Sequence, residues 1–169
     1  MRSAALFLLM FVAVGCSTKP AVSGPKPAIL KEENRAMQIK FTRSGGFAGA
    51  ATNVSGTVQW ADSGGVQVTS EGTEYRRDLA PLEAEQLQNG ADPSALARAK
   101  RASSASPVCD AYQYDITVIT RDGKTHPFTF TGGASSEAVK TAAPAAASLL
   151  SWVEQETQKI WTHRVNTRK

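Results

Sequence analysis

Cysteine and histidine, on which most metal sites and many nucleophilic sites depend, are scarce in this chain. Its 169 residues include two cysteines and two histidines, and they contain no His-Glu-x-x-His motif that could hold a catalytic zinc ion. The sequence also lacks a Gly-x-Ser-x-Gly nucleophile elbow, a phosphate-binding loop and a Gly-x-Gly-x-x-Gly stretch. We therefore expect that the protein is not an enzyme and that it carries no cofactor and no metal ion of its own.

One nucleophilic pair is conceivable, the thiol of Cys109 with the imidazole of His126. No third group is evident that would orient the imidazole, so we interpret Cys109 as a buried, unreactive residue and His126 as a sheet-edge residue. If Cys16 is consumed by lipidation, Cys109 has no disulfide partner. The fold must then be held together by its hydrophobic core.

Long apolar runs are confined to the N-terminus. Arg2 precedes the apolar segment Ala4–Val14, which ends in Ala13-Val-Gly-Cys16. This pattern is typical of a lipoprotein signal, with a plain secretory signal or a short buried helix as the alternatives. We expect that residues 1–15 are removed, and that the lipid on Cys16 anchors the protein in a bacterial cell envelope. Ser17 favours the periplasmic face of the outer membrane.

The remaining chain divides into three parts by composition. Residues 17–31 contain Pro20, Pro25 and Pro27 together with Gly, Ser and Lys and show no periodic apolar pattern, so over residues 16–36 we expect a lipidated N-terminus followed by a disordered tether. Residues 37–158 form one domain, and residues 159–169 form a basic tail that we expect to be solvated. The formal net charge of +4 is mild, so we predict no nucleic-acid partner. We also expect a monomer.

Alternating apolar and polar residues predict strands over residues 37–42, about 52–60, from Val66, and over 110–120. Met37, Ile39 and Phe41 are expected on the buried face of the first strand. The Asp122-Gly123 pair predicts a hairpin to a return strand that carries Phe128 and Phe130, which Pro127 marks as a sheet edge.

Helices are predicted over residues 79–88, with Asp78 as its cap, over 94–101, and from about 135 to 153, with a restart at Pro144. The expected fold class is α+β, with a four- to five-stranded antiparallel sheet and helices packed on one face.

The first predicted strand ends in an unusual loop, Arg43-Ser-Gly-Gly-Phe-Ala-Gly49. Glycines at a strand end tolerate positive φ and allow the chain to turn. The phenylalanine has no evident role in the turn itself. A large apolar ring at such a tip either folds back over the sheet or contacts a partner.

The segment from Met37 to Gly49 resembles the opening strand and Gly-Gly-Phe-Ala-Gly loop of the emfourin family, small bacterial inhibitors of thermolysin-like zinc metalloproteases. The similarity continues through the acidic helical segment Leu79–Gln88, the strand Asp110-Ala-Tyr-Gln-Tyr-Asp-Ile-Thr-Val118 and a closing helix near Val153. It covers about residues 37–153. The resemblance implies an inhibitor that presents an apolar residue to the substrate pockets of the protease and an aspartate to its zinc.

Carried onto this sequence, the resemblance makes Phe47 the apolar anchor, in a loop shaped by Gly45, Gly46, Ala48 and Gly49. The zinc-directed carboxylate is then Asp110, which matches the family's Asp-x-aromatic-x-aromatic entry to a strand, with Asp122 as the alternative.

Each assignment has a purely structural alternative. Phe47 can cover the end of the sheet, Asp110 can cap a turn, and Asp122 belongs to a common turn motif; Asp115 is expected on the solvent face of its strand. The competing function is a non-catalytic envelope lipoprotein that acts as a structural or adaptor binding module through its sheet edge.

Overall fold

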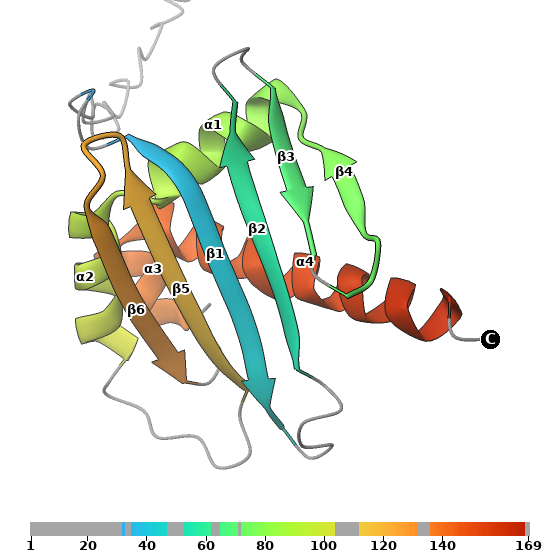
Figure 1. Cartoon of the computed structure of the whole chain (residues 1–169). Helices are drawn as coiled ribbons and strands as arrows, with labels where there is room; N and C mark the ends of the chain where they lie inside the picture. Colours follow the sequence, from blue (N-terminus) through green and yellow to red (C-terminus); the bar gives the residue numbers. More distant parts are fainter. Residues whose placement is uncertain are drawn as a thin grey trace, which may run out of the picture.

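The computed structural model describes residues 32, 35–46, 53–61, 65–70, 72–103, 112–131 and 136–167. Within these residues, six antiparallel strands form one sheet in the order β4-β3-β2-β1-β5-β6, and four helices cover one of its faces (Figure 1). The predicted α+β class is confirmed. The elements are β1 Ala36–Gly45, β2 Val54–Trp60, β3 Val66–Thr69, β4 Arg76–Asp78, α1 Pro81–Gly90, α2 Pro93–Ser103, β5 Tyr112–Thr120, β6 Thr125–Thr131, α3 Glu137–Ala142 and α4 Pro144–Thr167.

The two faces of the sheet differ as the alternating sequence pattern requires. The helix-facing residues Ile39, Phe41 and Ile116 are fully buried against α1, α2 and α4. The open face is polar, and Asp115 lies on it as predicted, accepting a 2.7 Å hydrogen bond from the hydroxyl of Thr129. This face is formed largely by Gln38, Lys40, Thr42, Ser55, Thr57, Gln67, Thr69, Asp115, Thr117 and Thr129.

The sheet has one strand more than the four to five that were predicted. The additional strand is β4, which the sequence pattern does not show because Arg76, Arg77 and Asp78 are all charged. It pairs with β3 and forms one edge of the sheet. The predicted cap at Asp78 is wrong: its carboxylate accepts a 3.0 Å hydrogen bond from Gln67, and α1 begins after Ala80, with Pro81 in its first turn and no side-chain cap.

Met37 is exposed, contrary to the prediction that it shares the buried face of Ile39. The pairing of β1 with β5 shifts between Ala36 and Gln38, so the side chain of Ala36 points inward in its place. Such an irregularity changes which residues face the core, and alternation alone cannot reveal it.

The predicted boundary at residue 158 falls inside α4, which continues to Thr167. Ile160 is 1 % exposed, and Trp161 packs against the core. Ile160 follows Val153 by seven residues, two helical turns, and therefore lies on the same face. Residues 159–167 are part of the folded domain and not a solvated tail.

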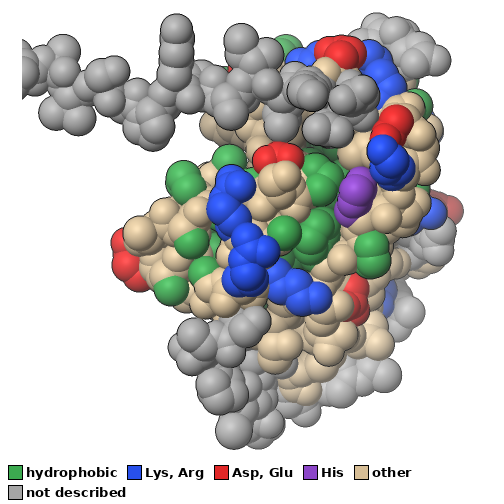
Figure 2. All heavy atoms as spheres, turned by 90° about the vertical axis from the view of Figure 1, so that its left-hand side faces the viewer, with side chains coloured by type: hydrophobic (Ala, Val, Ile, Leu, Met, Phe, Trp, Pro, Cys, Tyr) green, Lys and Arg blue, Asp and Glu red, His purple; other side chains and the backbone are tan. Residues whose placement is uncertain are grey.

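The other sheet edge is β6, and Pro127 lies on it as predicted. Proline removes one backbone donor from the free edge. Helix α2 packs beside β6 and carries Arg98, Lys100 and Arg101, and Figure 2 shows Lys and Arg side chains in a band across this side of the molecule. A missing donor and neighbouring cations both disfavour edge-to-edge pairing with another sheet.

Candidate functional site

The chain turns sharply where β1 ends. Gly45 and Gly46 have φ of 82° and 77°, a region that other residues rarely adopt. Gly45 pairs with Tyr112, the first residue of β5. The C-terminal end of β1, directly before the glycine-rich loop sequence, therefore lies beside the start of β5, at the lower end of the strands in Figure 1.

The ring of Tyr112 occupies the space beside Gly46. A Cβ atom at position 46 would lie 2.5 Å from Cε1 of Tyr112, closer than such atoms approach. Glycine is thus required here both by the backbone angle and by the neighbouring ring. Tyr112 itself is 36 % exposed, whereas Tyr114 on the same face of β5 is buried in the core.

Arg43 lies underneath this ring, on the helix-facing side of β1, and is 4 % exposed. Its guanidinium carbon is 4.7 Å from the centre of the Tyr112 ring, within the range of a cation–π contact. One guanidinium nitrogen donates a 3.3 Å hydrogen bond to Oε1 of Gln158 in α4, while the buried Nε has no hydrogen-bond partner.

Helix α4 also contacts the chain beyond the loop. Arg164 donates a 2.9 Å hydrogen bond to the backbone oxygen of Asn53, immediately before β2. The last turns of α4 therefore contact β1 at Arg43, through Gln158, and the chain directly before β2 at Asn53, through Arg164. Sequence reasoning missed this role because it assigned residues 159–169 to a tail.

Several predicted residues lie outside the described residues, namely Cys16, Phe47, Ala48, Gly49, Cys109 and Asp110. The described residues that flank the candidate loops are Gly46, directly before Phe47, and Tyr112, two positions after Asp110, and these two are in contact. His126 pairs with Val118, toward the other end of β5 from Tyr112.

Asp122 is at the opposite end of the sheet from Gly46, because the β5–β6 hairpin lies beside the start of β1. It accepts hydrogen bonds from the hydroxyl of Thr120 at 2.6 Å and the backbone nitrogen of Lys124 at 3.2 Å. The side chain of Lys124 and this hydroxyl hold the pKa of Asp122 well below its usual range. Asp122 thus closes a turn, and the structure does not bring it together with Gly45 and Gly46.

A second cluster of charges is buried where β4, α1 and α4 meet. The carboxylate of Glu156 is fully buried and accepts hydrogen bonds from Tyr75 at 2.6 Å and from Arg77 at 2.7 and 2.6 Å. Arg77 also binds Glu83, which in turn accepts a 2.6 Å hydrogen bond from the indole of Trp152. Each carboxylate thus has a cationic partner. Because Arg77 belongs to β4, Glu83 to α1 and Glu156 to α4, the cluster joins the edge strand to the helices.

These contacts perturb the pKa of several groups in the cluster. The bonds from Arg77 lower the pKa of Glu83 to about 2, against the opposing effect of burial. For Glu156, burial alone would raise the pKa, but the bonds from Arg77, Tyr75 and Lys159 outweigh burial and lower it. Burial and the bond to Glu156 raise the pKa of Tyr75 to about 12.

The protein should consequently lose stability in acid. A carboxyl whose pKa is lower in the folded state stabilises the fold above its unfolded pKa, and this contribution is lost as the pH falls toward its folded pKa. For Glu83 the window runs from about pH 5 down to about pH 2, with a loss of up to about 3 kcal/mol. Glu156 and Asp122 titrate with the same sign.

Urea unfolding at pH 7 and at pH 3 measures this loss. The Glu83→Gln variant should be less stable at pH 7 and should lose less stability between the two pH values. An unchanged pH dependence in this variant would contradict the assignment to Glu83.

No protein-family model, curated protein or solved structure matches this chain.

Among the described residues, no group of three or more His, Cys, Asp or Glu side chains could hold a metal ion, and no helix is long and apolar enough to cross a membrane. His163 makes an edge contact with the ring of Tyr75, with ring centres 5.6 Å apart.

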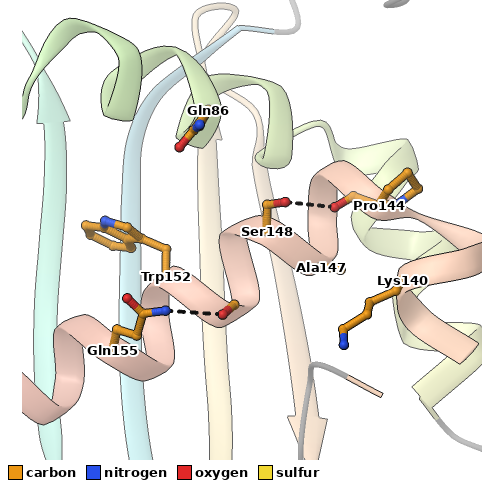
Figure 3. Close-up of a pocket in the computed structure, with 8 residues that line it drawn as sticks. Gln86, Lys140, Pro144, Ala147, Ser148, Trp152 and Gln155 are labelled. Carbon is orange, nitrogen blue, oxygen red and sulfur yellow. Dashed lines mark hydrogen bonds between the residues drawn. The ribbon is translucent and has the colours of Figure 1, made fainter. Parts of the chain in front are cut away.

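A shallow groove of about 690 Å³ runs along the outer side of the helices (Figure 3). Among the described residues that line it, Lys140 is the one charged group, and it lies 3.8 Å from Glu137. Ser148 and Gln155 donate hydrogen bonds within α4, to the oxygen of Pro144 and to the hydroxyl of Ser151. No hydrogen bond joins Lys140 to a serine of this described lining, so these residues do not form a nucleophile–base pair. It is lined by Gln86, Lys140, Pro144, Ala147, Ser148, Ser151, Trp152 and Gln155.

Proposed function

We propose that this protein inhibits thermolysin-like zinc metalloproteases, and that it blocks their active-site cleft with the loop that follows β1. The observation that carries the proposal is the glycine-dependent turn at Gly45 and Gly46, placed in contact with Tyr112 at the start of β5. Two consecutive glycines with positive φ give the chain a backbone conformation, and hence a direction after β1, that other residues rarely adopt. The resemblance of residues 37–49 to emfourins supplies the class of partner.

In this proposal, Phe47 enters a substrate pocket of the protease and the carboxylate of Asp110 approaches its zinc ion. Catalytic zinc keeps one coordination position open for water or substrate, and a carboxylate oxygen is a competent ligand there. The contact between Gly46 and Tyr112 supports a joint action of the two segments, because these residues flank the segments that carry Phe47 and Asp110.

The proposal extends to location. A lipid on Cys16 would hold the protein in the bacterial envelope, where it would meet an exported or envelope protease. This part rests on the sequence of residues 1–16.

The test is titration of thermolysin with the purified full-length protein and with Phe47→Ala and Asp110→Asn variants. We expect each substitution to weaken inhibition by about 30-fold or more, the effect of removing an interface residue worth about 2 kcal/mol. Asp122→Asn is the matched control, since it makes the same chemical change at the opposite end of the sheet, and it should leave the inhibition constant unchanged.

A folded wild-type protein that does not slow the protease at micromolar concentration would refute the proposal and leave the adaptor function in its place. Equal effects of Asp110→Asn and Asp122→Asn would refute the assignment of the carboxylate.

A further inference from the structure

We propose that Tyr112 is a second contact residue of the inhibitory surface, and that Arg43 and Gln158 are its positioning residues. This inference rests on the proposed function, because the partner surface is the rim of the cleft of a thermolysin-like protease. It adds a part of the surface that neither the loop sequence nor the family resemblance assigns.

The environment of Arg43 does not suit a residue that is kept for stability. Arg43 is 4 % exposed, and none of the ion pairs among the described residues includes it. Its Nε is buried without a hydrogen-bond partner. A buried charge and a buried unsatisfied donor both weaken a fold, and apolar side chains of similar size are often equal or better at such positions.

Arg43 contacts one aromatic ring and one amide. Its guanidinium stacks against the Tyr112 ring at 4.7 Å and is bonded to Gln158 at 3.3 Å. The edge of the same ring lies against Gly46. The ring is thus supported by β1 and, through Arg43, by α4, while 36 % of the residue remains exposed.

The Tyr112 ring lies next to the residues that flank both proposed contact segments. Tyr112 touches the residue directly before Phe47 and lies two positions after Asp110, so it adjoins both proposed contact segments. Rigid tyrosines with one exposed face are frequent anchors in protein interfaces, because little conformational freedom is lost when they bind. Tyr114, which is buried two residues further along the same face, offers no such surface.

The experiment measures two quantities for each full-length variant: the inhibition constant against thermolysin and the free energy of unfolding in urea. Arg43→Met should weaken inhibition about 10-fold while the free energy of unfolding stays the same or increases. Tyr112→Ala should weaken inhibition about 10-fold or more, whereas Tyr112→Phe, which keeps the stacked ring, should stay within about 2-fold of the wild type. Ser148→Ala, an exposed change on the same helix but ten residues before Gln158, is the control and should alter neither quantity.

The outcomes separate the two proposals. Absence of inhibition by the folded wild type would overturn the proposed function and this inference with it. Inhibition by the wild type that is unchanged in Tyr112→Ala would overturn this inference alone. A destabilised Arg43→Met variant with an unchanged inhibition constant would show that Arg43 is a structural residue, and would also overturn it.

Discussion

Replacing Arg77 with alanine should lower the free energy of unfolding by about 3–5 kcal/mol. The reason is the state of the partner that remains. Glu156 is fully buried, and in the variant its carboxylate would keep Tyr75 and Lys159 but lose its two bonds to the guanidinium. A buried carboxylate whose remaining cation is the half-exposed Lys159 is far more costly than the loss of an exposed ion pair.

The matched control for this prediction is Arg76→Ala. Arg76 is the preceding residue of the same strand, and its guanidinium binds the exposed side chain of Gln67. Its removal should cost less than about 1 kcal/mol, the usual range for an exposed polar contact. Urea unfolding followed by tryptophan fluorescence measures both, and similar losses in the two variants would disprove a special role for the buried cluster.

Phe41→Ala should lower the free energy of unfolding by about 3–5 kcal/mol, because core packing is lost. Phe41 is 1 % exposed and makes an edge-to-face contact with Trp152, with ring centres 5.7 Å apart. The neighbouring strand makes room for its ring at Gly56, where a Cβ atom would lie 2.3 Å from Cζ of Phe41. The ring and the glycine therefore form one packing unit.

This coupling has a direct test by thermal or urea unfolding. Gly56→Ala alone should destabilise by about 1–3 kcal/mol through overpacking, and Phe41→Leu alone through a cavity. The double variant should lose clearly less than the sum of the two, because the added methyl group enters the space that the ring vacates. Strict additivity would mean that Phe41 and Gly56 are not packed as described.

The parts of the fold that were predictable from sequence are those set by local pattern. The alternation in β5 and the Asp122-Gly123 turn gave the β5–β6 hairpin, and Pro127 identified its edge. Three consecutive charged residues concealed β4, and a shift in strand pairing exposed Met37. Local pattern does not encode which charged residues will meet.

Burial of charge depends on contacts between distant parts of the chain. Arg43 and Gln158 are 115 positions apart, and Arg77 and Glu156 are 79 apart. No spacing rule joins such pairs, so the sequence marked the turn at Gly45 and Gly46 as a candidate site but did not predict the arginine beneath Tyr112. The spacing of Val153 and Ile160 did contain the signal that α4 continues, although the basic composition of residues 159–169 obscured it.

The direction of β1 determines which end of the sheet would be nearest to an attachment at the N-terminal side of the domain. This strand starts at Ala36 beside the β5–β6 hairpin and reaches Gly45 after ten residues, a span of roughly 30 Å. An attachment point upstream of Ala36 is thus connected to one end of the sheet, while the glycine turn lies at the opposite end. In the proposed lipid-anchored form, Tyr112 and the turn would therefore lie at the end of the sheet away from the membrane, accessible to the proposed protease.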